Sequence, residues 1–318
     1  MYILDSHCDT PSEILRSRDI SIENENAHVD LPKLKRGRID GAFFALYIPA
    51  SMDSDPDKAF DYAKTLFDST ERAVKANSDS MAFATDENQA MANKDKGLVS
   101  VFLGLENASP IGDRLDRINW FYDKGVRYVT LCHSSDNQVC DSCASEVKTW
   151  GGLSPFGKEV VERMNSLGML VDVSHVSDDT FYDVLKCSKR PVVATHSCCR
   201  ALCDHPRNMT DDMIRALAAA GGVIQINFYP FFIDPDYASS GKRPPYTMIA
   251  DHIDHAVSLA GVDHVGIGSD FDGIEVTPEG MEDISMMPLL FDELRRRGYS
   301  ESDLDKIAGG NFFRVLRG

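Results

Sequence analysis

The sequence contains no long apolar run. No stretch approaches the ~20 consecutive apolar residues that a membrane-spanning helix requires, and the last residues up to Gly318 form no hydrophobic tail. A predicted strand begins at Tyr2 and a functional candidate follows at His7, so we expect no signal peptide ahead of the fold. These absences predict a cytoplasmic protein without a membrane span or lipid anchor.

Basic residues are also scarce. The chain has 33 Lys and Arg against 50 Asp and Glu, which gives a formal net charge of −17. Nucleic acids and anionic membranes both select basic surfaces, so this balance argues against either as a partner. The charge is typical of a soluble protein surface, and it leaves the oligomeric state, a homodimer included, open.

No disulfide or zinc-finger pattern of cysteines is present. In a cytoplasmic protein we expect the 8 cysteines to be free thiols. Cys140–Cys143 and Cys198–Cys203 resemble halves of a zinc knuckle or a redox pair, but neither has a second pair at finger-like spacing. Cys8 lies between His7 and Asp9, and alternation along an extended segment points its side chain away from theirs.

Short apolar runs recur along the whole chain and alternate with helical patterns. The predicted strands lie near residues 1–4, 42–48, 98–104, 127–132, 169–174, 191–195, 222–227 and 264–269. The predicted helices lie at 57–76, 86–94, 113–124, 155–167, 177–187, 210–220, 245–259, 281–297, 302–307 and 311–317. This alternation predicts a parallel sheet with right-handed crossovers, and eight strands predict a (β/α)8 TIM barrel. Such barrels commonly reach ~250 residues or more, so we expect residues 1–318 to form one domain.

Polar residues follow the predicted strands at the points where they stop. They are His7, Asp9, Glu106, His175, His196 and Asp270. The carboxyl ends of barrel strands meet at one mouth, where enzymes of this fold place their catalytic groups. One histidine after a strand is usually a satisfied polar residue. A series of ligand-type residues at successive strand ends predicts a metal centre instead.

The residue types divide between two ions. His7 and Asp9 share one face of an extended segment and can bind one ion. His175 and His196 follow adjacent strands and can bind a second ion, and the two oxygens of Glu106 can bridge both. Imidazole with carboxylate suits Zn²⁺ best, with Mn²⁺ or Co²⁺ as substitutes. A water shared by two such ions would lose a proton near neutral pH and become a nucleophile.

Two further residues complete the predicted chemistry. Asp270 follows the last strand and is placed to take up and return a proton. His133 follows the strand before that of His175, and we interpret it as a donor to a developing oxyanion rather than a fifth ligand. His252 and His255 imitate a metal pair by their i, i+3 spacing, but they lie on a predicted crossover helix and are expected to be structural.

Two irregular stretches, residues 133–154 and 229–245, follow predicted strands. We expect both to rim the mouth, where long ordered loops often form walls or lids. Plain surface loops are the alternative interpretation, and for the second stretch it carries equal weight.

Eight motifs occur in collinear order over nearly the entire chain. They are Asp5–Asp9, Gly152–Gly157, Asp172–Ser177, His205–Asn208, Asn227–Tyr229, Ala250–His255, Gly268–Gly273 and Gly309–Phe312. Together they resemble the renal (membrane) dipeptidase family of zinc peptidases. The resemblance implies two zinc ions bound as above with Glu106 bridging, and Asp270 as proton carrier. It also implies that His133, Arg207 and Tyr229 contact substrate; for the last two the resemblance is the sole argument.

The sequence departs from the family pattern at three places. Asn107 follows Glu106 where the family usually has glycine, and Thr195–Cys199 is atypical. Residues 134–146, with two cysteines, differ from the commoner asparagine-rich segment. We expect these changes to alter the rim and the substrate preference rather than the metal ligands.

These observations predict a zinc-dependent dipeptidase with two Zn²⁺ per chain. As the resemblance suggests, its substrates would include dipeptides with a D-residue on the carboxyl side, and Arg207 would hold the substrate carboxylate through paired donors. One alternative is a related amidohydrolase acting on a cyclic amide, lactam or N-acyl amino acid. Another is a barrel that binds metal and peptides without catalysis. Asp270 argues against the last, because a binding protein needs no proton carrier.

Overall fold

Nine parallel strands form one sheet in the computed structural model, which describes residues 1–318. The strands are β1 (Leu4–Cys8), β2 (Gly41–Tyr47), β3 (Met81–Phe83), β4 (Val99–Glu106), β5 (Val126–Thr130), β6 (Leu170–Asp172), β7 (Val193–Ser197), β8 (Val223–Ile226) and β9 (Val265–Ile267). Eight of them pair in the order β1-β2-β4-β5-β6-β7-β8-β9, and β3 adds to the start of β4.

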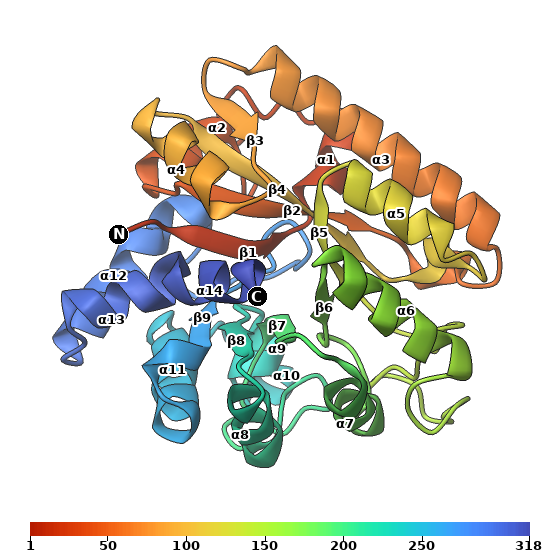
Figure 1. The fold of residues 1–318 in the computed structure, drawn as a ribbon. Coiled ribbons are helices and arrows are strands. Elements are labelled where there is room, and N and C mark those ends of the chain that lie inside the picture. Colours follow the sequence, from red (N-terminus) through yellow and green to blue (C-terminus); the bar gives the residue numbers. More distant parts are fainter.

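The first and last strands meet and nearly close the sheet. The backbone N–H of Asp270 donates to the carbonyl of His7 at 3.1 Å, and that of Asp9 donates to Phe271 at 2.9 Å. Helices surround these strands on the outside (Figure 1). The predicted (β/α)8 barrel is confirmed.

The helices follow the strands in chain order. They are α1 (Thr10–Leu15), α2 (Leu31–Arg36), α3 (Pro56–Ala76), α4 (Glu87–Asp95), α5 (Asp116–Asp123), α6 (Pro155–Leu167), α7 (Asp178–Cys187), α8 (Asp211–Ala219), α9 (Pro230–Ile233), α10 (Tyr237–Ser240), α11 (Thr247–Ala260), α12 (Met287–Arg296), α13 (Glu301–Asp305) and α14 (Asn311–Arg317). None is long and apolar enough to cross a membrane.

Capping residues set several helix ends. The hydroxyl of Ser177 accepts from the backbone N–H of Thr180 at the start of α7. Gly168 ends α6 in the left-handed conformation, with φ of 76°, where a side chain would be strained. These caps fix where each crossover helix stops and the next strand begins.

Aromatic residues fill the amino-terminal end of the barrel. The ring of Phe43 packs on Phe102 and on Phe312 of α14, with centroid distances of 4.8 and 5.0 Å. Phe313 and Tyr128 belong to the same buried cluster. Helix α14 therefore closes this end of the barrel, and the opposite end, where the strands finish, is left for the site.

The first strand begins later than predicted. The sequence placed it at residues 1–4, whereas β1 runs from Leu4 to Cys8. Its polar residues are buried and bonded inside the barrel: the Asp5 carboxylate accepts from Ser269, and Ser6 donates to the carbonyl of Thr195 at 2.7 Å. Because these polar side chains are hydrogen-bonded inside the barrel, the strand continues through them. The apolar run in the sequence therefore ends before the strand does.

Other differences concern short elements. Strand β3 has three residues, and α1, α2, α9 and α10 have four to six, too few to show a period. The helix predicted at 302–307 is divided, because α13 ends at Asp305 and a π-helical turn, Lys306–Gly310, follows it. None of these changes alters the order of strands that carry the site.

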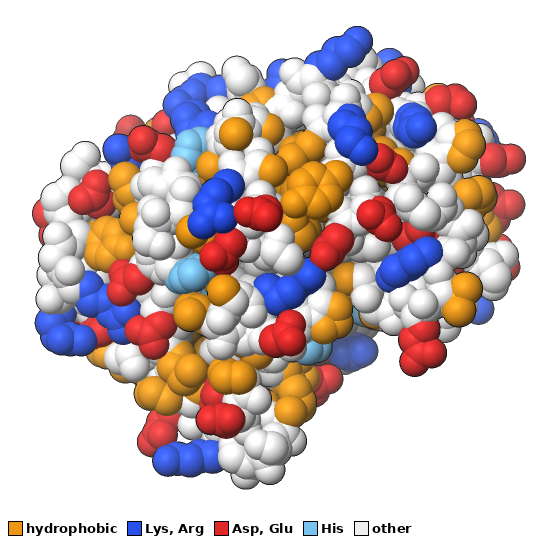
Figure 2. Space-filling view, turned by 90° about the horizontal axis from the view of Figure 1, so that it is seen from below, with side chains coloured by type: hydrophobic (Ala, Val, Ile, Leu, Met, Phe, Trp, Pro, Cys, Tyr) orange, Lys and Arg blue, Asp and Glu red, His pale blue; other side chains and the backbone are white.

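The surface shows no separation of charge on the face drawn in Figure 2. Acidic and basic side chains are interspersed there, with apolar side chains between them. The excess of negative charge in the sequence is therefore not gathered into one acidic region of this face.

Candidate metal centre

The predicted ligands converge at the carboxyl mouth of the barrel. His7 lies in β1, Glu106 is the last residue of β4, and His196 lies in β7. His175 and Asp270 come shortly after β6 and β9. The structure thus brings together the residues that the sequence placed at successive strand ends.

Backbone conformation aims two of these side chains. His175 and Asp270 adopt positive φ values of 71° and 66°. Non-glycine residues in this region each cost about 1–3 kcal/mol and cluster where function requires them. The reversal of the chain at these positions turns the side chains back over the mouth.

The two oxygens of Glu106 face different imidazoles. Oε1 lies 3.0 Å from Nε2 of His175 and 3.5 Å from Nε2 of His196. Oε2 lies 3.4 Å from Nε2 of His7. One carboxylate therefore stands between His7 on one side and His175 and His196 on the other, as expected of a bridging ligand.

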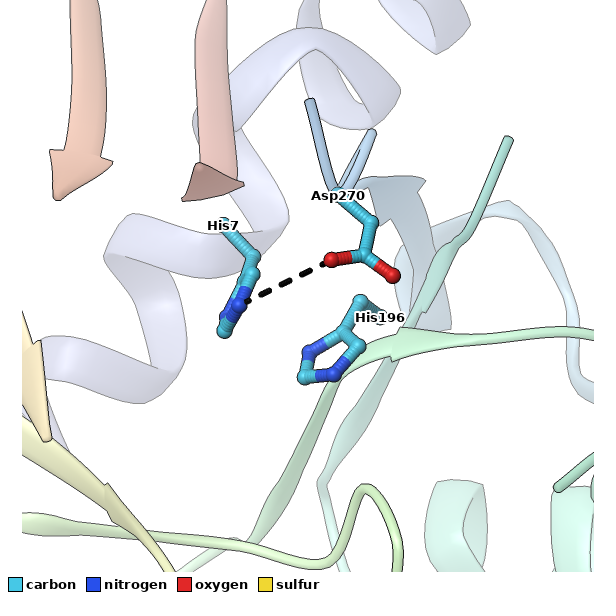
Figure 3. Close-up of side chains that lie close together, drawn as sticks. All are labelled: His7, His196 and Asp270. Carbon is cyan, nitrogen blue, oxygen red and sulfur yellow. Dashed lines mark ion pairs between the residues drawn. The ribbon is translucent and has the colours of Figure 1, made fainter. Parts of the chain in front are cut away.

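The side chains around His7 complete the first set. Its Nε2 lies 3.4 Å from Oδ2 of Asp9 and 3.9 Å from Oδ1 of Asp270. His7, His196 and Asp270 point toward a common space (Figure 3). The Nε2 atoms of His175 and His196 approach to 2.9 Å on the other side.

Unpartnered buried atoms indicate that cations fit here. Nε2 of His7 and Oδ1 of Asp9 are buried and have no hydrogen-bond partner. Burial and the nearby Glu106 raise the pKa of Asp9 to about 6, and burial also raises that of Asp270 to about 7. Three crowded carboxylates with imidazole nitrogens form a donor set that suits zinc-class ions.

The imidazoles experience opposing effects. Burial lowers the pKa of His7, but the carboxylates of Glu106 and Asp9 outweigh it and raise that pKa well above its ordinary value. Burial and the nearby Arg207 lower the pKa of His175 well below its ordinary value; burial and His7 do so for His196. Neutral imidazoles are the form that binds metal.

His133 stands at the edge of this group. Its Nε2 is 3.9 Å from Oε1 of Glu106, farther than those of His175 and His196. Burial and the adjacent Arg207 lower its pKa to about 4, so the ring is neutral near pH 7. It is close enough to be a ligand with Glu106 and His175, and it also lines the cavity where substrate would lie.

Arg207 is a buried cation without an ion-pair partner. One Nη donates to the backbone carbonyl of His196 at 3.0 Å, while Nε is buried and unpartnered. By contrast, buried Arg117 is paired with Asp57. Because an unpaired buried charge is costly, the free face of the Arg207 guanidinium could accept an anion.

Two connected chambers open beside the predicted metal ligands. The acidic chamber, about 410 Å³, is lined by carboxylates that include Asp9, Glu106 and Asp270. The arginine chamber, about 280 Å³, contains Arg207 and the apolar side of Phe232. His133, His175, Asp270, Gly273, Ile274 and Glu275 line both chambers.

Glu275 is a residue of the site that no sequence pattern predicts. It accepts a hydrogen bond from the Tyr229 hydroxyl at 3.0 Å, so the predicted substrate contact Tyr229 is held to the opposite loop. Its exposed carboxylate stands on a loop after β9 with no periodic pattern around it. Its position shortly after the last strand is the one feature of the sequence that could have indicated a role in the site.

Backbone conformation explains why Asn107 can stand where the family usually has glycine. Asn107 has φ of 77°, a conformation that glycine adopts freely and asparagine tolerates. Its buried side chain donates to the carbonyl of Ile48 at 3.1 Å and to Asp53 at 2.8 Å. It lines neither chamber, but its Oδ1 accepts from the side-chain amide of Asn137 at 3.0 Å, so it connects the strand end that carries Glu106 to the segment 134–146.

The other two departures differ in their position. Cys143 and Ala144, from the segment 134–146, line the arginine chamber, as expected of a rim change. Residues 195–199 lie in and just after β7, and they are buried, so this segment belongs to the barrel interior rather than to the rim. The chamber-lining residues of 134–146 and of 229–245, including Tyr229 and Phe232, support the interpretation of both stretches as walls of the mouth.

The cysteines and outer histidines have structural surroundings. All eight cysteines are free, and no group of residues that could hold a metal includes one. Cys8 is buried with its sulfur 3.9 Å from the Ser269 hydroxyl, away from the ligands. His252 on α11 accepts from the backbone N–H of Cys199 at 3.1 Å, and His255 pairs with Asp211 at 2.8 Å. Both lie on a crossover helix, as predicted, and neither belongs to a group of residues that could hold a metal.

Comparisons of sequence identify relatives over the same span. A family model described as membrane dipeptidase (peptidase family M19) matches residues 1–318. The chain is 35% identical over 332 aligned positions to dipeptidase verJ of Clonostachys rogersoniana, covering 99% of this chain and 83% of that protein. It is 36% identical over 294 positions to dipeptidase aclJ of Aspergillus oryzae, covering 91% and 69%.

Solved structures agree with the sequence matches. The probable dipeptidase PvdM from Pseudomonas aeruginosa has a TM-score of 0.92 at 26% identity, over 99% of this chain and 94% of that chain. A metallo peptidase from Rhodobacter sphaeroides, liganded with a phosphinate mimic of the dipeptide L-Ala-D-Ala, has a TM-score of 0.91 at 27% identity, over 100% and 99%. With the family model matching from end to end, this chain belongs to the membrane dipeptidase family, peptidase family M19, and is a metallo-dipeptidase.

Proposed function

We propose that this dipeptidase works with two zinc-class ions per chain, one held by His7 and Asp9 and the other by His175 and His196. Glu106 would be shared. The observation that carries this proposal is the division of the Glu106 oxygens between the two histidine sets, at 3.4 Å on one side and 3.0 and 3.5 Å on the other. When bound, such ions would polarise the scissile carbonyl and lower the pKa of bound water toward 7.

Asp270 would carry the proton. Its Oδ2 accepts from the side-chain amide of Asn227 at 2.9 Å, which leaves Oδ1, on the side of His7, to take a proton from water. A pKa raised to about 7 by burial suits a group that must accept a proton and return it to the leaving amine. His133, neutral at this pH, would donate to the developing oxyanion through a ring N–H.

Each of the two chambers would bind one end of a dipeptide. The unpaired guanidinium of Arg207 would bind the substrate carboxylate. The carboxylates of the acidic chamber would face the free ammonium. The bound dipeptide mimic of the Rhodobacter sphaeroides neighbour, with its D-Ala at the carboxyl side, supports D-residues as acceptable at that position.

The proposal is tested with a panel of substrates on zinc-loaded protein. Free dipeptides with L- and D-residues at the carboxyl end are compared with N-acyl amino acids and with lactams. We expect free dipeptides to have the highest kcat/KM. Faster turnover of a lactam or an N-acyl amino acid would overturn the assignment in favour of a related amidohydrolase.

The cellular location and the assembly remain predictions. The composition favours a cytoplasmic protein, without a membrane as partner, and admits a homodimer. Fractionation of cells that express the tagged chain, and light scattering of the purified protein, would test them directly.

A further inference from the structure

Asp172 is a buried carboxylate in the barrel interior, at the end of β6, that the chemistry proposed above does not use. It has no cationic partner. Instead it accepts five hydrogen bonds, from the backbone N–H and hydroxyl of Ser174, the backbone N–H and hydroxyl of Thr195, and the hydroxyl of Thr130. Donors from three neighbouring strand ends therefore converge on one anion, which holds those ends in register.

The Thr195 hydroxyl links this carboxylate to a proposed metal ligand. Its oxygen lies 2.6 Å from Oδ2 of Asp172 and 2.8 Å from Nδ1 of His196. An ionised carboxylate can only accept, and a hydroxyl has one proton to give. Thr195 therefore donates to Asp172 and must accept from His196. The proton of the neutral imidazole is thereby assigned to Nδ1, and Nε2 keeps its lone pair.

The backbone of His196 is held in the same way. Its N–H donates to the Ser174 hydroxyl at 3.1 Å, and that hydroxyl donates to Asp172 at 2.9 Å. The ring and the main chain of His196 are thus both linked, through one hydroxyl each, to the carboxylate of Asp172. Its Nε2, left with a lone pair, lies 2.9 Å from Nε2 of His175 and 3.5 Å from Oε1 of Glu106, on the side where the second ion is proposed. In the metal-free protein His175 is then the donor in the contact between the two Nε2 atoms.

His7 is held differently. Its Nδ1 lies 2.9 Å from the hydroxyl of Tyr128, and that hydroxyl makes no other side-chain hydrogen bond. A phenol without a second acceptor can donate to the imidazole as well as accept from it. The network therefore assigns the tautomer of His196 and leaves that of His7 unassigned.

We propose that Asp172 and Thr195 are positioning residues that lock His196 in the Nδ1–H tautomer before metal arrives. Tautomer control by an outer partner is a general way in which proteins tune metal-binding histidines, and loss of such a partner typically costs ~10- to 100-fold in metal affinity. The inference rests on His196 being a metal ligand, as in the proposed function, but the tautomer itself is a property of the metal-free protein.

The test begins with ¹⁵N NMR of histidine side chains in the metal-free full chain. We expect His196 to show a protonated Nδ1 and an unprotonated Nε2. Thr195→Val should lose this preference and weaken binding of one of two zinc ions by ~10- to 100-fold, measured by chelator competition. Thr195→Ser keeps the hydroxyl and should retain both the tautomer and the affinity.

Thr130→Val is the matched control. Thr130 donates to the same Oδ2 of Asp172 at 2.6 Å but does not bond His196. It should lower the free energy of unfolding about as much as Thr195→Val while leaving the tautomer and zinc affinity unchanged. Equal losses of affinity in both variants would overturn the positioning role, since general destabilisation would then explain them.

Two other results would also overturn the inference. One is an Nε2–H tautomer of His196 in the unaltered protein, and the other is a Thr195→Val variant with unchanged tautomer and unchanged affinity. A different result would contradict the proposed function. A protein with the expected tautomer that binds two ions but cleaves no dipeptide would contradict the function and leave the positioning role standing.

Discussion

The floor and the rim of the barrel mouth differ in construction. On the floor, His7, Glu106 and His196 are almost completely buried and belong to strands that pair with their neighbours. On the rim, Tyr229 and Glu275 lie on loops and are partly or fully exposed. The strand ladder fixes the floor, so we expect the barrel itself to carry the chemistry. The rim lies on loops, which vary more freely than strands, so we expect the loops to determine selectivity.

The largest expected effect is at the centre of the floor. Glu106→Gln removes the one carboxylate that both ions would share, so both should be lost with nearly all activity. Elemental analysis of purified protein measures the metal. Glu275→Gln, which neutralises an exposed carboxylate on the rim, is the matched control and should keep two ions per chain. Two retained ions in Glu106→Gln would contradict the bridging role.

Asp270, on the loop just after β9, should separate proton transfer from metal binding. Asp270→Asn keeps the shape and the contact with Asn227 but removes the proton acceptor. Turnover should fall by ~10²-fold or more, with little change in metal content. If the metal is lost in proportion to the activity, Asp270 is a ligand and the assignment as proton carrier is wrong.

A smaller and substrate-dependent effect is expected at Arg207, in the wall between floor and rim. A hydrogen bond to a charged group contributes about 1.5–3 kcal/mol. Arg207→Met should therefore lower kcat/KM on a free dipeptide by roughly 10- to 150-fold. Amidating the substrate's carboxyl end should cost the unaltered protein about as much.

The two changes at Arg207 form a double-mutant cycle. Because each removes the same interaction, their losses should not add. Steady-state kinetics of both enzymes on both substrates supplies the four values. Fully additive losses, or equal rates on free and amidated dipeptides, would refute carboxylate capture by Arg207.

The smallest kinetic effect is expected at Asn107, which braces the floor without touching either chamber. Asn107→Gly accepts the positive φ but loses the bonds to Ile48 and Asp53. The free energy of unfolding should fall by about 1–3 kcal/mol, measured by denaturant titration, with little change in kcat/KM. Asn107→Ala should be less stable still, by the strain of its φ. Loss of zinc from the glycine variant would place Asn107 among the groups that position the metal.

The contrast between floor and rim also explains what the sequence could predict. Strand ends are visible as the point where an apolar run stops, so Glu106, His175 and Asp270 could be found from their spacing. Glu275 is one of 50 acidic residues and lies outside any periodic segment, so nothing in the pattern marks it. Arg207 and Tyr229 were found by family resemblance rather than by spacing.

Polar groups inside the barrel were harder to interpret than those at its mouth. Asp172 and Thr195 lie within predicted strands, where a polar residue only interrupts the apolar pattern and indicates no role. Their role depends on partners from three different strands, which no local pattern reveals. The same effect shortened the first predicted strand, because Asp5 and Ser6 are satisfied by residues far along the chain.

The seam between β1 and β9 has a consequence for the order in which the molecule becomes functional. Asp5 and Ser269, which bond across this seam, are 264 positions apart. His7 and Asp270 flank it, so neither can meet the other until nearly the whole chain has been brought together. Contacts of such long range form late in folding. Zinc affinity should therefore arise at the end of refolding, and added zinc should slow unfolding far more than it accelerates folding.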